Sequence, residues 1–195
     1  MRIVGGRHKG RTISGPHGHE VRPTSDRVRE SVFNILEHRD WGESGLSVLT
    51  NAHVLDAFCG TGALGLEALS RGAYHTTFMD ISRDSIDSCR TNVGMLNEYN
   101  AATILRGDCL KPVRPSEACN LVFLDPPYKE RIAMSSLEAL AANGWIANKG
   151  ICVIETRANQ PLETPSQFEN LDQRKYGAAR LNFLRYRHDP NQFLP

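Results

Sequence analysis

The chain has 195 residues, of which 40% are hydrophobic and 23% charged, enough for one globular domain with a small appendage. It contains no run of about 18 apolar residues, and its basic start lacks the apolar core of a signal peptide, so we expect a cytoplasmic protein with no membrane span. Five widely spaced cysteines without a CxxC pair argue against a disulfide framework or a zinc site, so no metal is expected.

The net charge of +1 hides an uneven distribution of charge along the chain. Residues 1–29 hold seven basic and two acidic residues, and residues 174–188 hold five basic and no acidic residues. Residues 30–173, in contrast, hold eleven basic and nineteen acidic residues. Basic ends around an acidic middle favour a polyanionic partner that the two ends contact, although a solvated surface would also explain them.

The N-terminal third predicts a small appendage followed by one helix. Residues 1–22 are basic and rich in glycine, with short apolar alternation that favours a hairpin. Thr24, Ser25 and Asp26 are candidate caps for a helix whose apolar residues recur at helical spacing from Val28 to Leu36. Residues 42–51 are predicted to form a loop.

From residue 53 onward, strands and helices alternate. Strands are predicted at 54–58, 76–80, 102–108, 121–125 and 151–156. Helices are predicted at 63–71, after the cap Ser82, and between the fourth and fifth strands. This pattern is typical of an α/β fold with a mostly parallel, Rossmann-like sheet, helices on both faces, and ligands at the carboxyl ends of the strands. Residues 176–187 predict a hairpin turn and an antiparallel C-terminal strand.

A glycine-rich turn separates the first strand from its helix. Gly60, Gly62 and Gly65 form a GxGxxG pattern, which lets the backbone turn tightly and approach a ligand. A glycine-rich turn without a ligand is the simpler alternative. Asp80 ends the second strand, where an acid can accept both hydroxyls of a ribose. Together these features favour a cofactor of the adenosine type without identifying it.

Two further acids narrow the choice of cofactor. Asp56 lies just before the glycines, where it would gain nothing from the pyrophosphate of a dinucleotide but would favour a cationic sulfonium and ammonium. Asp108 ends the third strand and is placed to accept from an adenine amine, although a turn acid would look the same. S-adenosylmethionine (AdoMet) therefore fits better than a nicotinamide dinucleotide.

The fourth predicted strand ends in the sequence "LDPPY". Two successive prolines remove two backbone donors and stiffen the chain, which leaves carbonyls and the Asp125 carboxylate as acceptors beyond the strand. An ordinary Asp-Pro turn is the simpler alternative. A rigid group of acceptors suits a ligand that carries N–H donors.

These residues carry a resemblance to a known family. "DAFCGTGALGLEALSRGA" resembles motif I of class I AdoMet-dependent methyltransferases, and "LDPPY" resembles the (D/N)PP(Y/F) motif of enzymes that methylate amine or amide nitrogens. "RIVGGRHKGR", "RPTSDRVRESVFNIL", "NGW" and "YGAARLNFLRY" are further similar to the RsmD family. That family methylates the N2 amine of a guanine in small-subunit (16S) ribosomal RNA, guanine 966 by resemblance.

The resemblance and the chemistry together predict the site residues. Catalysis is assigned to Asp125 and the Pro126 carbonyl, which accept the two hydrogens of the amine, and to Tyr128, which stacks on the base. The predicted cofactor-binding residues are Asp56, Phe58, Gly60, Thr61, Gly62, Asp80, Ile81, Asp108 and Cys109. The predicted substrate-binding residues are Arg7, Lys9, Arg11, Arg22 and Pro127. Thr24 and Asp26 are also candidate site residues, although capping explains them more simply.

The predicted organisation is a basic N-terminal hairpin extension over residues 1–22 and an AdoMet-dependent methyltransferase domain over residues 23–195. The expected partner of this monomer is ribosomal RNA within a small-subunit ribonucleoprotein particle. Alternatives that share some of the motifs are a methyltransferase acting on DNA or on a protein glutamine, an NAD oxidoreductase, and a noncatalytic RNA-binding module.

Overall fold

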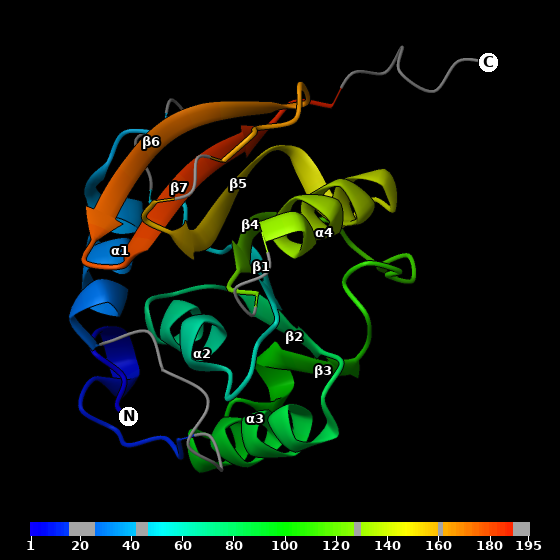
Figure 1. The fold of residues 1–195 in the computed structure, drawn as a ribbon. Coiled ribbons are helices and arrows are strands. Elements are labelled where there is room, and N and C mark those ends of the chain that lie inside the picture. Colours follow the sequence, from blue (N-terminus) through cyan, green and yellow to red (C-terminus); the bar gives the residue numbers. More distant parts are fainter. Residues whose placement is uncertain (16–25, 42–46, 127–129, 160–161, 189–195) are drawn as a thin grey trace.

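The computed structural model describes residues 1–15, 26–41, 47–126, 130–159 and 162–188. Within them the chain forms a seven-stranded sheet in the order β3-β2-β1-β4-β5-β7-β6. Strands β1 to β5 are parallel, and β7 is antiparallel to both of its neighbours (Figure 1). The strands are β1 His53–Ala57, β2 His75–Asp80, β3 Ala102–Arg106, β4 Cys119–Leu124, β5 Ile146–Arg157, β6 Phe168–Tyr176 and β7 Ala179–Tyr186.

Helices cover both faces of this sheet, as the alternation of strands and helices predicts (Figure 1). Helices α1 Asp26–His38, α2 Ala63–Ser70 and α3 Arg83–Met95 share one core with alternate strand residues such as Val54 and Phe123. Helix α4 Glu130–Ala142 shares the second core with the intervening residues, such as Leu55 and Val122. Because side chains alternate along a strand, one apolar run fills both cores. The predicted Rossmann-like fold is therefore confirmed.

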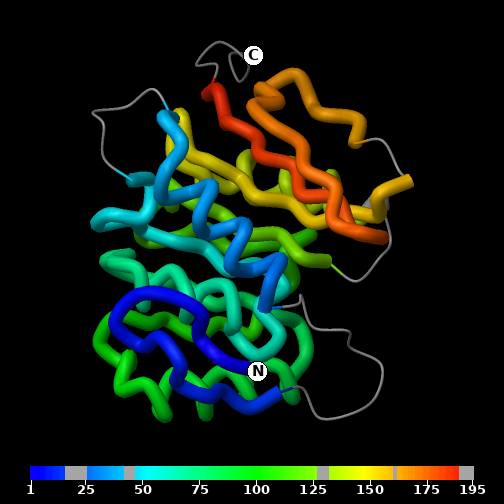
Figure 2. The backbone as a smooth tube through the Cα atoms, turned by 90° about the vertical axis from the view of Figure 1, so that its left-hand side faces the viewer, coloured from blue at the N-terminus to red at the C-terminus, as the bar shows by residue number. Residues whose placement is uncertain are grey.

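The N-terminal segment, residues 1–15, lies against the outer side of α2 and α3 (Figure 2). An antiparallel bridge joins Arg2 to Thr12, a 3-10 turn covers Gly6–His8, and Ile3 and Ile13 are buried in the α1-α2-α3 core. This is the antiparallel pairing that the alternation predicts. Gly6 has φ +68°, and a Cβ there would overlap the carbonyl of Ser70, so glycine is required for this close approach.

Local sequence signals explain several element boundaries. The hydroxyl of Ser82 accepts from the N–H of Ser85 and caps α3 as predicted. The first strand ends at Ala57 rather than at residue 58, because Phe58 has φ +63° and leaves the strand. The third strand ends at Arg106, two residues earlier than predicted.

Two stretches of sheet are absent from the prediction. Strand β5 begins at Ile146 rather than at residue 151, and its first half contains the exposed residues Asn148 and Lys149. Strand β6, at the edge of the sheet, has only Phe168 fully buried. Its sequence "FENLDQRKY" has no apolar alternation because most of its side chains are exposed or half-buried. Among the described residues, its outer side has no neighbouring strand. All five cysteines are free and buried. Among the described residues, no helix is long and apolar enough to cross a membrane.

Candidate active site

The candidate site lies where β1, β2 and β4 end side by side. Strand β1 pairs in parallel with β2 on one side and with β4 on the other, so their carboxyl ends share one edge of the sheet. The chain leaves β1 toward β2 and reaches β4 only later, which makes the gap between β1 and β4 a topological switch point. Ligands of open α/β sheets bind at such a point. Asp56, Asp80 and Asp125, which we call the strand-end acids, all lie at this edge.

Asp56 is a buried acid in acidic surroundings. Its side chain is 2% exposed, and its Oδ2 accepts from the N–H of Gly65 at 2.8 Å. Burial raises the pKa of Asp56 well above its usual value, and the charges of Asp125 and Asp80 raise it further. A cation placed beside these carboxylates would reverse this effect. The electrostatics therefore favour a positively charged ligand at this edge.

Asp80 joins the end of β2 to the glycine-rich turn. Its Oδ2 accepts from the N–H of Gly60 at 2.9 Å, and its Oδ1 accepts from the N–H of Ser82 at 2.8 Å. These bonds orient the carboxylate at the strand end and leave each oxygen a second lone pair. Its predicted contact with ribose hydroxyls stays a prediction. The next residue, Ile81, is 62% exposed, which leaves an apolar side chain beside this carboxylate.

The turn between β1 and α2 contains three left-handed residues. Phe58, Gly60 and Gly62 have φ values of +63°, +53° and +81°. The N–H of Gly62 donates to the Cys59 carbonyl at 2.7 Å and closes the turn. A Cβ at Gly60 would meet nothing within 4 Å, whereas a Cβ at Gly62 would lie 2.9 Å from Cys89 Sγ. Gly60 thus leaves open space above the turn, while Gly62 allows it to rest on α3.

Gly65, the third glycine of the pattern, serves packing rather than ligand approach. A Cβ there would overlap the ring of Phe78 and lie 2.7 Å from the Thr76 methyl. Helix α2 can therefore pack closely on β2 only because residue 65 is glycine. Its N–H is also the donor to Asp56. The first two glycines of the GxGxxG pattern thus shape the turn, and the third allows α2 to pack on the sheet.

The segment after β3 carries the last two predicted cofactor residues. Asp108 Oδ1 accepts from the N–H of Leu110 at 2.9 Å, which gives this acid a local role in a turn. Cys109 is buried and takes a backbone hydrogen bond from Phe58, and burial raises the pKa of its thiol to about 12. Cys109 therefore packs as a neutral thiol beneath the glycine-rich turn. The contact of Asp108 with adenine stays a prediction.

The predicted catalytic residues follow β4. Asp125 is half-buried and Pro126 is buried. The charge of Asp125 raises the pKa of Asp56. The fourth strand thus brings the Asp125 carboxylate to the same edge as the glycine-rich turn. Pro127 and Tyr128 lie outside the described residues. Their roles stay predictions.

The predicted basic contacts are spread over several places. Arg7 forms an ion pair with Glu98 at 2.6 Å, Arg11 donates to the Met95 carbonyl at 2.7 Å, and Lys9 is exposed. Met95 is the last residue of α3, and Glu98 lies between α3 and β3. Both therefore lie toward the amino end of the sheet, opposite Asp125. Arg22 lies outside the described residues. RNA binding by these four side chains stays a prediction.

The basic C-terminal strand is divided between the two edges of the sheet. Arg187 forms an ion pair with Glu169 at 2.8 Å, and Arg185 lies 3.8 Å from the same carboxylate, both at the amino edge. Arg180 donates to the Ala158 carbonyl at 2.6 Å, where β5 ends at the carboxyl edge. An extended strand separates charges that are close in sequence. Only its first residues lie on the side of the strand-end acids.

One residue of the site was not found from the sequence. Asn92 lies on the buried face of α3 with 0% exposure, and its Nδ2 donates to the Thr61 carbonyl at 2.9 Å. Thr61, itself buried, is the residue between Gly60 and Gly62. A polar residue between Cys89 and Val93, on the apolar face of a helix, is the signal that points to it. Such a residue requires buried partners.

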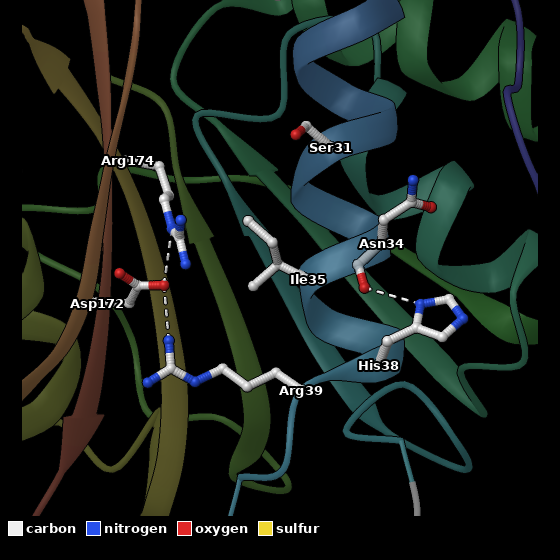
Figure 3. Close-up of a pocket in the computed structure, with 7 residues that line it drawn as sticks. All are labelled: Ser31, Asn34, Ile35, His38, Arg39, Asp172 and Arg174. Atoms are coloured by element: carbon white, nitrogen blue, oxygen red, sulfur yellow. Dashed lines mark hydrogen bonds and ion pairs between the residues drawn. The ribbon is translucent and has the colours of Figure 1, made fainter.

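A separate groove lies between α1 and β6 and has a volume of about 630 Å³ (Figure 3). In it, Arg39 and Arg174 approach the same oxygen of Asp172, at 2.7 and 3.0 Å. Its remaining lining residues are Ser31, Asn34, Ile35 and His38. The strand-end acids lie at the carboxyl ends of β1, β2 and β4, so this groove is not part of the candidate site.

Comparisons with known proteins agree with this geometry. The family described as conserved hypothetical protein 95 matches residues 1–185. Ribosomal RNA small subunit methyltransferase D of Escherichia coli K12 is 34% identical over 164 residues, covering 84% of this chain and 78% of the relative. The chain belongs to the RsmD family. The protein of the same name from Haemophilus influenzae is 30% identical, covering 91% of this chain and 89% of the relative.

The fold is shared with a solved structure as well. The Escherichia coli protein yhhF, provisionally named a methyltransferase, superposes with a TM-score of 0.80 at 28% identity, covering 96% of this chain and 98% of the other. The chain that carries this sheet order and these strand-end acids is thus a member of the RsmD family. Its likeness to a solved neighbour extends over nearly its whole length.

Proposed function

We propose that this protein transfers a methyl group from AdoMet to the exocyclic N2 amine of a guanine in 16S ribosomal RNA. Family membership supports a methyltransferase of ribosomal RNA, and the finer target, guanine 966, rests on family resemblance alone. The observation that carries the proposal is the position of Asp56, Asp80 and Asp125 around the Gly60 turn at one edge of the sheet.

The residues present fit AdoMet better than a dinucleotide. AdoMet carries a sulfonium and an ammonium, both of which are attracted by the strand-end acids, whereas a pyrophosphate would be repelled. Asp56 would lie beside the cationic methionyl part, Asp80 would accept the ribose hydroxyls, and exposed Ile81 would cover one face of the adenine. The open space at Gly60 admits the ligand close to the backbone. When bound, AdoMet supplies an activated methyl group on a good leaving group.

Asp125 and Pro126 then orient the acceptor. The lone pair of a guanine N2 amine is delocalised into the ring, which makes the amine a poor nucleophile. The Asp125 carboxylate and the Pro126 carbonyl accept its two hydrogens, so that the nitrogen can pyramidalise and direct its lone pair out of the ring plane. Tyr128 holds the base by stacking. Positioning and local charge supply most of the acceleration, and the nitrogen gives up one proton after the transfer.

The wider organisation follows from the same proposal. Residues 1–22 form a basic extension of the methyltransferase domain, which spans residues 23–195. The substrate is RNA within a small-subunit particle, whose folded surface supplies the specificity. The enzyme acts as a monomer in the cytoplasm.

The test is transfer of labelled methyl from AdoMet to two substrates, naked 16S RNA and small subunits from cells that lack the modification. The expected result is label in one guanine, at N2, with subunits labelled faster than naked RNA. The Asp125→Ala protein serves as the control for contaminating activity. Label in DNA or protein, or at a base other than guanine, would contradict the proposal.

A further inference from the structure

Asn92 connects two segments that are 47 positions apart in the sequence. Its Oδ1 accepts from the N–H of Ser14 at 2.8 Å, and its Nδ2 donates to the Ser14 carbonyl at 3.1 Å. The same Nδ2 donates to the Thr61 carbonyl at 2.9 Å. One buried amide thus binds the N-terminal segment and the glycine-rich turn at once. Because Asn92 and Thr61 are both buried, the bond between them is shielded from water, whereas the two bonds to Ser14 are partly buried.

The turn needs support of this kind. Thr61 stands between Gly60 and Gly62, and glycine on both sides gives the backbone many alternatives in solution. The bond from Asn92 fixes the orientation of the Thr61-Gly62 peptide group. Cys89 lies three residues before Asn92 on α3, and its sulfur limits how closely the glycine-rich turn can approach the helix at Gly62. Helix α3 therefore determines the shape of the turn through two side chains on one face.

The N-terminal segment is a firm anchor because it is held elsewhere as well. Its N–H at Val4 donates to the buried Glu67 at 2.8 Å, and its carbonyl at Gly5 accepts from Ser70 Oγ at 2.6 Å. The side chains of Arg7 and His8 both contact Glu98. These contacts do not involve the turn. Ser14 therefore reaches Asn92 from a segment that is already docked.

We propose that Asn92 is a positioning residue that couples residues 1–15 to the glycine-rich turn, so that the docked N-terminal segment raises the affinity for the cofactor. The proposal rests on the proposed function, because it takes AdoMet as the ligand of the turn. It assigns the segment a role in cofactor binding that is independent of any contact with RNA. A turn without this bond must be ordered by the ligand, and that ordering lowers affinity.

The first test is the Asn92→Ala variant, titrated with S-adenosylhomocysteine by calorimetry. The expected result is affinity about five- to tenfold weaker, as for the loss of one buried hydrogen bond. In ligand-free protein, hydrogen exchange should become faster in a peptide that covers residues 58–66. The matched control is Asn182→Ala, because Asn182 is equally buried and donates instead to the Ile154 carbonyl and Thr156 Oγ1. The control should lose stability but keep both the affinity and the exchange rate of the turn.

A second test needs no variant and applies even if Asn92→Ala fails to fold. Coupling is reciprocal, so S-adenosylhomocysteine bound to the wild-type protein should slow exchange in a peptide that covers residues 9–15. Protection of residues 58–66 without protection of residues 9–15 would overturn the inference. So would equal affinities of the Asn92→Ala and Asn182→Ala variants.

Failure of the proposed function would look different. A wild-type protein that binds neither AdoMet nor S-adenosylhomocysteine would defeat the proposed function. The ligand-free exchange of residues 58–66 in Asn92→Ala would still decide whether Asn92 orders the turn. Unchanged exchange there would overturn the inference.

Discussion

Two groups of charged side chains flank α2, and they differ in their balance of positive and negative charge. The α2 ion network, made of Arg29, Glu37, Glu67 and Arg71, alternates in sign. Glu67 is fully buried, with Oε1 at 2.8 Å from Arg71 Nε and Oε2 at 3.7 Å from Arg29 Nε. Arg71 also reaches Glu37 at 2.7 Å. The strand-end acids at the other end of the helix all carry the same sign.

This difference in charge balance indicates that the network serves the stability of the fold, whereas the strand-end acids serve function. In the α2 ion network each buried charge has a partner of opposite sign within the protein. Among the strand-end acids, the charges of Asp80 and Asp125 instead raise the pKa of Asp56. Like charges at one strand edge cost stability and are relieved by a cationic ligand. We therefore expect substitutions in the network to change stability, and substitutions among the acids to change binding or turnover.

The largest expected effect is on catalysis. Asp125→Ala should lower kcat for methyl transfer by roughly 1000-fold, because the amine loses the charged acceptor that orients it. Affinity for S-adenosylhomocysteine should stay within about twofold, since Asp125 is assigned to the acceptor side. Single-turnover kinetics and calorimetry measure the two quantities. Turnover equal to that of the wild type would defeat the mechanism.

The α2 ion network should give the largest effect on stability. Glu67→Gln removes the buried carboxylate between Arg29 and Arg71 and leaves them only the partly exposed carboxylates of Asp26 and Glu37, so the free energy of unfolding should fall by about 3 kcal/mol. Urea denaturation measures it. The matched control is Asp172→Asn, whose partners Arg39 and Arg174 are partly exposed and whose loss should cost about 1 kcal/mol or less. Equal losses in the two variants would contradict the comparison.

A smaller effect is expected on cofactor affinity. Asp80→Ala removes the acceptor of the Gly60 and Ser82 N–H groups and the proposed ribose contact, so affinity for S-adenosylhomocysteine should fall about 30-fold. Asp108→Ala tests the adenine contact by the same calorimetry. A fall of less than about threefold would limit Asp108 to its turn, whereas a tenfold fall would support the adenine contact.

The smallest effect concerns Asp56 and pH. Its pKa is raised in the folded protein above the ordinary value of 3.8, so the native state holds the proton more tightly than the unfolded state. The contribution of Asp56 to stability is therefore greatest below pH 3.8 and is lost as the pH rises through the native pKa. Asp56→Asn keeps an acceptor for the Gly65 N–H but removes the charge. At pH 7 the variant should be about 1 kcal/mol more stable than the wild type and bind AdoMet more weakly.

Urea denaturation between pH 4 and pH 8 tests this sign. The wild type and Asp56→Asn should converge toward the acid end, where native Asp56 is protonated while the unfolded chain, with an ordinary value of 3.8, is still partly ionised. A variant that is less stable than the wild type at pH 7 would show that the Asp56 charge is compensated within the protein.

Local chemistry explains why most of the fold is predictable. Apolar runs, the Ser82 cap and the glycine pattern are signals read over a few residues, and they place the parallel strands and therefore the edge that carries Asp56, Asp80 and Asp125. Strand β6 is not predicted because most of its side chains are exposed or half-buried, so its sequence has no apolar alternation. The links of Glu67 to Val4 and of Asn92 to Ser14 escape it because each joins segments more than 60 residues apart. Gly6 shows the same limit, since its need for glycine comes from Ser70 in another element.

Strand β6 also affects how the sheet can associate. In the part of the chain that the structure describes, it is the last strand of the sheet order, so its outer side offers unpaired backbone groups to other chains. Glu169, Asp172, Arg174 and Lys175 place charges along this edge, and a register shift between Asn170 and Asp172 interrupts its regular pairing. Charges and a bulge both disfavour the addition of a further strand. The polar sequence of β6, because of which the strand is not predicted, thus also protects the sheet from edge-to-edge aggregation.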